Sequence, residues 1–408
     1  MNILFLCIGE FSSINSRGIY PDLMRQLKNE GNNVHVCCCY EKRVGKETEL
    51  VEDDGAKLLH VKIGNITKCG MIEKGISTLR IESQYKKAIK KYFNGIKFDL
   101  IIYSTPPITF AKVIEYLKKR DGAKTYLLLK DIFPQNAIDI GVLKKSGIKG
   151  LLYKYFRKKE KKLYAFSDKI GCMSQANVDY VLQHNPEVDN NKVEICPNCI
   201  DPVDISISNE ERIAMREKYG FPLDKKVFVY GGNLGRPQSV PFIVECLKAC
   251  ADIEESYFVI AGSGADRHFL EEYVKEEKPK HLKLMGFVSK DEYDKMIACC
   301  DVGLIFLDYR FTIPNFPSRL LSYMQAGLPV LACTDPNTDV GKVIVGAGFG
   351  WWCESSSVEV FAKTVKMVCQ ADLKEAGEQA WKYMNEKYTV RLGSEIILES
   401  TGGKQCLD

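Results

Sequence analysis

The feature that most constrains this chain is a unit repeated through its second half: a short apolar run, a glycine-rich turn, and a stretch with helical spacing. A helix after each strand returns the chain so that the next strand runs parallel to the last. Parallel strands buried on both faces read as continuous apolar runs. The apolar runs are 227–230, 257–261, 282–285 and 302–307, and the helical stretches are 239–251, 266–277, 289–299, 316–327 and 357–370.

The first half repeats this pattern, and 408 residues are enough for two cores. We therefore predict an α/β chain of two doubly wound, Rossmann-like domains, 1–198 and 199–371, joined by a polar linker that ends near residue 225. Ligands of such sheets bind beyond the carboxyl ends of the strands, so a cleft between the two sheets is the expected site. The strands expected in the first half are 2–8, 33–39, 58–62, 98–103, 124–130, 169–173 and 193–196.

Composition argues against membrane-spanning and secreted proteins. No window approaches the roughly 20 apolar residues that a spanning helix needs, and the N-terminus reads as a first strand rather than a signal. The sixteen cysteines lie within strand-like and helix-like runs. They are expected to be small buried hydrophobic residues in a reducing cytosol. Cys196 and Cys199 form one Cys-x-x-Cys at the domain junction, for which a redox role is the less favoured reading.

Neither a metal nor another cofactor is expected. The five histidines do not pair at the spacing of metal ligands, and no Asp-x-Asp offers a divalent-metal clamp. There is also no Gly-x-Ser-x-Gly elbow and no Walker loop with its lysine.

The net charge of +4 hides an asymmetry, because residues 1–200 carry +11 and the remainder −7. Seven basic residues and one acid lie between Lys149 and Lys162, interleaved with leucine and aromatic residues. Such a helix suits an anionic membrane surface or a phosphorylated lipid. The alternative is the solvated face of a connecting helix. The residues expected to contact such a lipid or the membrane are Lys154, Arg157, Lys158 and Lys161.

The stretch from Asn315 to Ala332 reads as a helix opened by Pro317 and Ser318 and stopped by Gly327, followed by a buried strand. Free N–H groups and the helix dipole favour an anion at a helix N-terminus, where Arg319 also stands. An ordinary helix–loop–strand unit without a ligand is the alternative.

A second candidate is the turn Gly231-Gly232-Asn233-Leu234-Gly235-Arg236. Its glycines allow close approach of a ligand to the backbone, and Arg236 stands where a diphosphate needs a cation. Two further turns at strand ends contain Gly264 and Val288. For each of these, a turn that only reverses the chain is the alternative.

These segments together resemble the retaining glycosyltransferases of family 4, which have the GT-B fold. The resemblance implies that Gly232, Asn233, Gly264, Val288 and Ser318 bind a nucleotide-sugar donor, with Arg236 and Arg319 on its diphosphate. Family members usually carry a glutamate that holds the donor's ribose, and here that position is Ser322. It also implies that a helix within about 372–408 crosses back to brace the first domain.

Two motifs of the first half resemble family 4 enzymes that act on undecaprenyl-linked sugars. They are Ser104-Thr105-Pro106-Pro107 and Lys130-Asp131-Ile132-Phe133-Pro134, and both follow strands. The resemblance implies that Asp131 binds an acceptor hydroxyl or the transferred sugar. An aspartate that caps the next turn is the alternative.

The expected function is a cytoplasmic, peripherally membrane-associated transferase. It would move a hexosyl or N-acetylhexosaminyl group from a nucleotide diphosphate to a lipid-linked acceptor, with retention and without a metal, as a bacterial capsule, O-antigen or exopolysaccharide is built. Two alternatives stay open: a nucleotide-sugar-binding partner of a catalytic subunit, which Ser322 favours, and a nucleotide-sugar epimerase.

Overall fold

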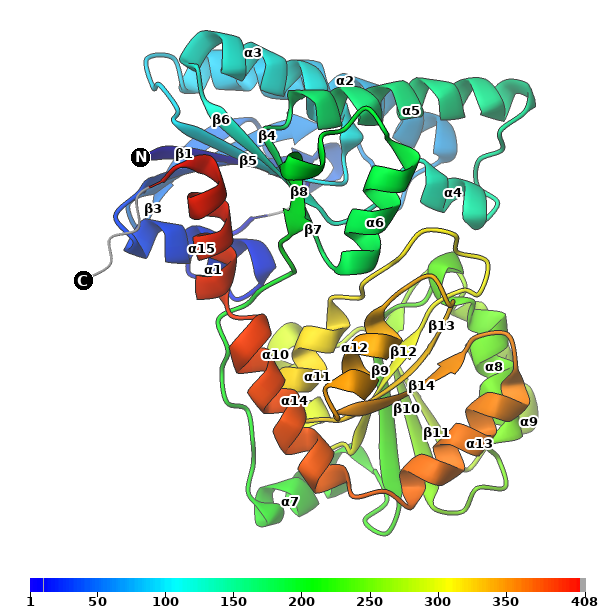
Figure 1. Ribbon diagram of the computed structural model, residues 1–408. Helices are drawn as coiled ribbons and strands as arrows, with labels where there is room; N and C mark the ends of the chain where they lie inside the picture. Colours follow the sequence, from blue (N-terminus) through cyan, green and yellow to red (C-terminus); the bar gives the residue numbers. More distant parts are fainter. Residues whose placement is uncertain (10, 404–408) are drawn as a thin grey trace. The chain divides into compact units, whose positions relative to one another are not determined.

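The computed structural model describes residues 1–9 and 11–403 and divides into two compact units (Figure 1). The first unit is Met1–Asp201 with Thr389–Asp408, and the second is Pro202–Tyr388. Both units are Rossmann-like α/β domains, as predicted. Residues 404–408 of the expected C-terminal segment lie outside the described part.

The first unit is built on an eight-stranded sheet of order β3-β4-β2-β1-β5-β6-β7-β8. Every pair is parallel except β3 with β4. Its strands are β1 (Asn2–Leu6), β2 (Asn33–Glu41), β3 (Glu49–Asp53), β4 (Ala56–Ile63), β5 (Leu100–Ser104), β6 (Lys124–Leu129), β7 (Lys169–Cys172) and β8 (Val193–Ile195).

Helices cover both faces of this sheet, which explains why its strands are continuous apolar runs. The helices α2 (Met71–Tyr92), α3 (Ala111–Asp121) and α5 (Gly147–Phe166) lie over one face (Figure 1). The helices α1 (Ile19–Asn29) and α15 (Val390–Thr401) lie over the other, where Leu27 and Ile397 join one apolar core. The short helices α4 (Gln135–Asp139) and α6 (Gln175–His184) follow β6 and β7.

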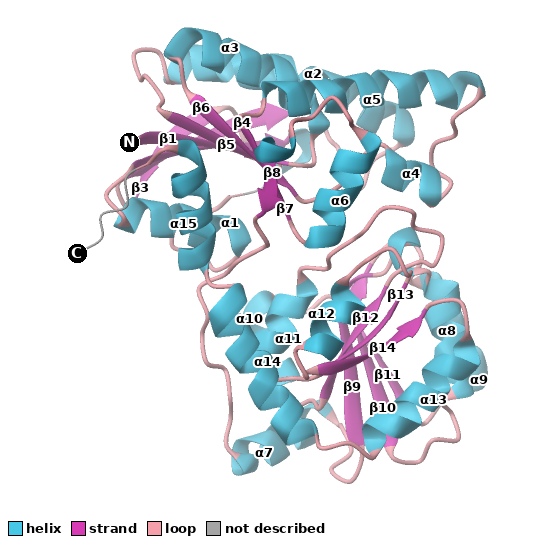
Figure 2. Ribbon diagram, in the orientation of Figure 1, coloured by secondary structure: helices cyan, strands magenta, loops and turns pink. Residues whose placement is uncertain are grey.

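The second unit has a six-stranded, all-parallel sheet of order β11-β10-β9-β12-β13-β14 (Figure 2). The order reverses direction beside β9, which is the point where doubly wound sheets bind ligands. Its strands are β9 (Lys226–Asn233), β10 (Ser256–Ser263), β11 (Leu282–Met285), β12 (Val302–Phe306), β13 (Val330–Thr334) and β14 (Gly350–Glu354).

Two layers of helices enclose this sheet as well. One layer packs α8 (Val240–Ala249), α9 (His268–Glu277) and α13 (Val358–Cys369) on the apolar core around Phe228 and Phe258. The other side carries α10 (Lys290–Ala298), α11 (Arg319–Gln325), α12 (Val340–Gly346) and α14 (Leu373–Lys387) (Figure 1). The linker leads into α7 (Asn209–Tyr219), which Ser208 caps with a capping box.

The structure differs from the sequence-based expectation in five places. The strands β3 and β14 and the helix α12 were not predicted; β3 is an exposed edge strand, so it lacks the apolar signal. Helix α11 is shorter than the expected 316–327 and has seven residues. The chain returns to the first unit at Thr389 rather than near 372, because α14 stays in the second unit, where Gly377 lies directly against the backbone of Gly327.

The described cysteines are free thiols, and all of them except Cys69 are buried, as predicted. Burial raises the pKa of Cys172 and Cys199 to about 12, so these thiols stay protonated. Within residues 1–9 and 11–403, no helix combines the length and hydropathy needed to cross a membrane.

Candidate functional site

The carboxyl ends of β9 and β10 bring the expected donor-binding residues together in the second unit. Gly232, the next-to-last residue of β9, has φ 132°, a left-handed conformation that favours glycine. A Cβ added to Gly232 would lie 3.3 Å from Nη2 of Arg319. Gly232 and Arg319, 87 positions apart in sequence, therefore lie beside each other.

Arg319 begins α11 and has no carboxylate partner within the described residues. Its guanidinium stacks on the ring of Tyr230, with 4.1 Å from Cζ to the ring centroid. Its Nη1 is buried and has no hydrogen-bond partner. A cation that is held by an aromatic ring and has an unused donor is suited to bind an anion.

Tyr323 fixes the helix that carries Arg319. Its hydroxyl lies 3.1 Å from the carbonyl oxygen of Val229 in β9 and 3.0 Å from that of Leu304 in β12, so it can donate to the middle of either strand. Its ring fills the space that a side chain at Gly303 would need. Helix α11, which begins with Arg319, is thereby attached to β9 and β12.

Arg236 lies in a single 3-10 turn (Arg236–Gln238) after the glycine turn and is exposed. It forms no hydrogen bond or ion pair with another side chain of the described chain, so its charge is available to a ligand. The N–H of Asp308 donates to the carbonyl of Pro237 at 2.9 Å, which ties this turn to the end of β12. Asn233 is exposed and donates from Nδ2 to Gln238.

Three other glycines near this edge also have a packing role. A Cβ on Gly262 would collide with the carbonyl oxygen of Gly232, and one on Gly264 with that of Leu234. Gly231 makes room for the ring of Tyr293. The two turns thus pack backbone against backbone, and only Gly232 also borders Arg319.

The remaining donor-side candidates lie around the same edge. Ser318 is the exposed N-cap of α11, although its hydroxyl makes no capping bond. Ser322 is partly exposed and stands one turn further along the helix, on the same side as Ser318. Val288 is partly exposed in the loop between β11 and α10. Arg267 donates to the carbonyls of Gly262 and Met285, which joins the ends of β10 and β11.

Sequence reasoning missed a buried carboxylate at the end of β13. Asp335 is fully buried and accepts the N–H groups of Asn337 at 2.9 Å and Thr338 at 3.1 Å. Burial raises its pKa to about 6. Thr338 donates in turn to the carbonyl of Asn315. The signal that could have found Asp335 in the sequence is the buried strand Val330–Thr334, because this aspartate directly follows the end of that strand.

In the first unit, the two expected motifs meet at Thr105. Its Oγ1 accepts the N–H groups of Lys130 at 3.0 Å and Asp131 at 3.2 Å, so the ends of β5 and β6 are joined. The ammonium group of Lys130 donates to the carbonyl of Cys196. Burial raises the pKa of Asp131 to about 6, although Asn136 donates to its carboxylate at 2.6 Å.

The four basic candidates of α5 divide into two kinds. Arg157 is held inside the fold by Glu160 at 2.6 Å and by Asn185. Lys161 pairs with Glu187 at 2.9 Å. Lys154 and Lys158 are exposed and have no ion pair in the described chain. The charge expected to face a membrane is therefore partly neutralised within the protein.

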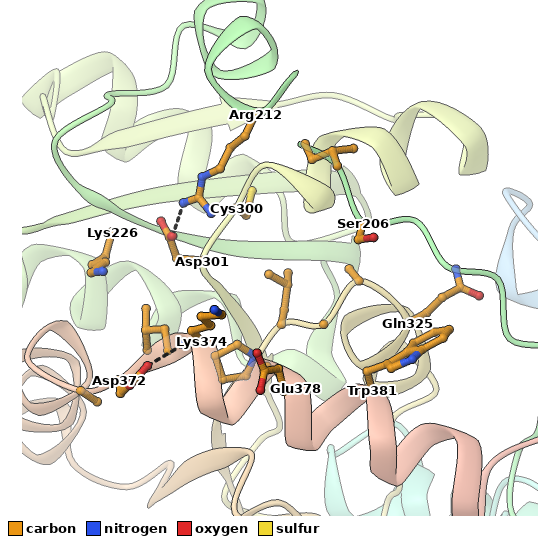
Figure 3. A pocket seen from close by; sticks show the side chains of 18 of the residues that line it. Ser206, Arg212, Lys226, Cys300, Asp301, Gln325, Asp372, Lys374, Glu378 and Trp381 are labelled. Atoms are coloured by element: carbon orange, nitrogen blue, oxygen red, sulfur yellow. Dashed lines mark hydrogen bonds and ion pairs between the residues drawn. The ribbon is translucent and has the colours of Figure 1, made fainter. Parts of the chain in front are cut away.

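A cavity of about 730 Å³ in the second unit lies at the opposite edge of its sheet (Figure 3). Lys226 and Asp301, which stand where β9 and β12 begin, line it, with Trp381 of α14 on the far wall. Its charged groups are of both signs, and Arg212 already pairs with Asp301. This cavity is separate from the donor-side residues. Among the described residues, no group of three or more His, Cys, Asp or Glu side chains is arranged to hold a metal ion.

Each half of the chain matches a known glycosyltransferase family. Residues 22–204 match the family described as Glycosyltransferase Family 4, and residues 211–383 match Glycosyl transferases group 1. Together these matches support a GT-B glycosyltransferase of the family 4 type. The chain is 23% identical to the probable glycosyltransferase WbjE of Pseudomonas aeruginosa over 336 residues, which are 82% of this chain and 81% of that protein.

A further relative is a glycosyltransferase by name, and two solved structures have the same fold. The putative colanic acid biosynthesis glycosyl transferase WcaI of Escherichia coli is 21% identical over 66% of each chain. Anabaena HepE, solved in complex with UDP, superposes with a TM-score of 0.69 at 13% identity and covers 99% of this chain and 100% of its own. Sucrose-phosphate synthase of Thermosynechococcus elongatus gives 0.71 at 14% identity over 98% of both chains. These structures share the fold of this glycosyltransferase.

Proposed function

We propose that this glycosyltransferase takes its sugar from a nucleotide diphosphate donor bound at the carboxyl edge of the second unit's sheet. The observation that carries the proposal is the position of Arg319, whose unpartnered Nη1 and ring-stacked guanidinium border the Gly232 turn. Arg236 adds a second cation without a partner in the described chain. HepE, which has the same fold, was solved with UDP and with UDP-glucose.

Two cations beside the diphosphate would stabilise the nucleotide diphosphate as it leaves the sugar. The bond from the sugar to the diphosphate breaks as negative charge grows on the phosphate oxygen, and fixed cations stabilise that charge without reorganisation. We propose transfer without a metal and with retention of the anomeric configuration. The assignment of retention rests on the family resemblance.

We further propose that the acceptor is a lipid-linked glycan held by the first unit, in the synthesis of a bacterial capsule, O-antigen or exopolysaccharide. Asp131 is placed by the Thr105 bridge at the carboxyl edge of that sheet. Above its pKa of about 6, its carboxylate accepts a hydrogen bond from an acceptor hydroxyl. A peripheral position on the inner face of the cell membrane follows from a lipid-linked acceptor, with Lys154 and Lys158 as the cations available to lipid headgroups.

The proposal is tested by incubating the purified protein with UDP- and GDP-sugars and a bacterial membrane extract, and measuring release of the nucleotide diphosphate. Release that depends on the extract is expected. Tight binding of a donor without release in any extract would favour the alternative of a non-catalytic partner subunit, which Ser322 in place of glutamate suggests. Conversion of the donor to an epimer without an acceptor would favour the epimerase.

A further inference from the structure

The first turns of α2 carry an apolar stripe that faces solvent. Ile72 is 81% exposed, Ile76 49% and Leu79 54%. Their spacing of four and three residues puts them on one side of the helix. Helices of globular proteins turn such a stripe toward the core, and α2 does so only from Ile81 onward, where Ile81 and Tyr85 are buried.

The first turns of α5 repeat this arrangement. Ile148 is 83% exposed, Leu151 67%, Leu152 44% and Tyr155 40%. These positions again follow the helical repeat. The side that packs inward is formed instead by Gly150 and by Phe156, whose ring contacts Phe133 at 5.0 Å.

The two stripes lie at the same end of neighbouring helices. Glu82 of α2 accepts the N–H of Lys112 in the first turn of α3, and its other oxygen pairs with Lys159 of α5 at 2.9 Å. Glu82, Lys112 and Lys159 therefore lie at the same height along the three helices. Near the end of α3, Lys118 donates to the carbonyl of Phe166, the last residue of α5.

The ends of α3 and α2 also lie close to each other. Arg120, near the end of α3, donates to the carbonyl of Phe93, directly after α2. The helices α2, α3 and α5 thus run in one direction. The stripe of α2 lies three to ten residues before Glu82, and that of α5 lies four to eleven before Lys159, or roughly 5–17 Å along each axis. The apolar ends of α2 and α5 both extend beyond the start of α3.

Cations without an ion pair in the described chain accompany the apolar stripe of α5. Lys149, Lys154 and Lys158 are exposed and make no ion pair within the described residues. By contrast, Lys159 and Arg157, deeper in the fold, are paired with Glu82 and Glu160. Apolar side chains surrounded by free lysines match the interface of an anionic bilayer, where acyl chains lie beneath acidic headgroups.

We infer that the exposed ends of α2 and α5 insert their apolar stripes into the surface of an anionic bilayer, with Lys149, Lys154 and Lys158 at the headgroups. The inference rests on the proposed lipid-linked acceptor and adds that apolar insertion, rather than the charge of α5 alone, holds the protein there. A charged surface alone would release the protein in salt, since the Debye length falls to about 3 Å at 1 M. Apolar insertion persists under those conditions.

The test is flotation of the full chain with vesicles of phosphatidylcholine and phosphatidylglycerol, at about 0.1 M and about 0.5 M salt. The triple variant Ile148→Ser, Leu151→Ser, Leu152→Ser is expected to lower partitioning by about tenfold or more at both salt concentrations, because buried apolar area is lost. The pair Ile72→Ser and Ile76→Ser should act in the same direction. The variant Lys149→Gln, Lys154→Gln, Lys158→Gln should weaken binding mainly at low salt.

The matched control is Val360→Ser with Met367→Ser, two residues of α13 in the second unit that are 46% and 54% exposed. This control should float like the parent. Equal flotation of the α5 triple variant and the parent would overturn the inference. So would a parent that ignores vesicles but forms a dimer or binds a protein through these stripes, as shown by light scattering.

Failure of this inference is distinguishable from failure of the proposed function. Titration of UDP- and GDP-sugars into the α5 triple variant measures donor binding, which we place in the second unit. The affinity of this variant should match that of the parent. Flotation without any donor binding would leave the membrane inference standing and remove the proposed donor. Donor binding without flotation would do the reverse.

Discussion

Arg319 is a cation that the fold holds against Tyr230 without a carboxylate partner in the described chain. A half-buried charge of this kind costs stability, and its retention is explained by a ligand that uses it. We expect Arg319→Met, which keeps the volume and removes the charge, to weaken binding of a nucleotide diphosphate by roughly 1.5–3 kcal/mol while leaving stability unchanged or higher. Calorimetric titration and thermal unfolding measure the two effects.

Two controls accompany this variant. Arg236→Ala should also weaken binding, because it removes an exposed cation from the same turn without touching a core contact. Arg212→Met alters a charged residue of the separate cavity and should leave donor affinity unchanged. Normal affinity in both Arg319→Met and Arg236→Ala would contradict the placement of the donor.

Ser322 stands where family 4 enzymes usually carry glutamate, and it is partly exposed one turn beyond Ser318. If it faces the ribose, a carboxylate at this position can accept two hydrogen bonds from the ribose hydroxyls. We expect Ser322→Glu to tighten binding of the nucleotide diphosphate by up to about tenfold, and Ser322→Ala to weaken it slightly. Loss of binding in Ser322→Glu would show that the pocket is shaped around a small side chain.

The raised pKa of the buried Asp131 carboxyl predicts how the stability of the protein depends on pH. Its folded pKa of about 6 lies above the ordinary value of 3.8, so between these values the native state binds more protons than the unfolded state. Stability therefore falls as pH rises from about 4 to about 6. We expect Asp131→Asn to be more stable than the parent by about 3 kcal/mol at pH 7 and by little at pH 4. Urea unfolding at both pH values measures this.

The raised pKa of Asp131 also predicts how the rate of sugar transfer depends on pH. If the Asp131 carboxylate receives an acceptor hydroxyl, the transfer rate should rise with pH through a limb near 6, and Asp131→Asn should lack that limb. Asp335, whose pKa burial also raises to about 6, is the control, because Asp335→Asn should keep the limb. A parent without any change in rate between pH 5 and 7 would contradict the role of Asp131.

At the scale of elements, the glycine turns after β9 and β10 form a packed pair. Gly264→Ala would bring a Cβ against the carbonyl oxygen of Leu234, so we expect it to destabilise the second unit by roughly 2 kcal/mol. Gly286, in the turn after β11, has open space around its Cα, and Gly286→Ala should stay within about 0.5 kcal/mol of the parent. Chemical unfolding compares the two. Equal stabilities would mean that the turns are looser than the structure shows.

At the scale of the whole molecule, the second unit is one continuous segment and the first is not. Residues 202–388 have their own core, and their two ends are tied down by contacts of Val203 with Gln325 and of Tyr388 with Phe316. We expect this segment to fold alone and to bind a nucleotide diphosphate as the full chain does. Removal of 389–408, by contrast, takes Ile397 and Leu398 out of the first unit's core and should unfold that unit.

Circular dichroism and donor titration of the two truncated chains test this division. A folded segment 202–388 without donor affinity would place part of the donor site in the first unit. A stable first unit without 389–408 would show that α15 only covers the sheet.

Much of the fold was readable from sequence because its signals are local. Apolar runs such as Val302–Phe306 and Val330–Thr334 need burial on both faces, and glycines at their ends mark turns, so the parallel sheets could be predicted. Edge strand β3, with exposed side chains, carries no such signal. Helix α14 looked like a brace for the first unit, because polarity alone does not reveal which core a helix contacts.

For the site, sequence by itself determined which residues follow the strands and begin the helix α11. They are the glycine turn with Arg236, the motifs of Thr105 and Asp131, and Arg319. Only the tertiary structure decided what each of them contacts. It placed Arg319 on Tyr230 beside Gly232, set Gly264 against the backbone of Leu234, and paired Arg157 with Glu160. The physical reason is range: strand and turn propensities act over a few residues, whereas burial and charge pairing join atoms that are tens of residues apart.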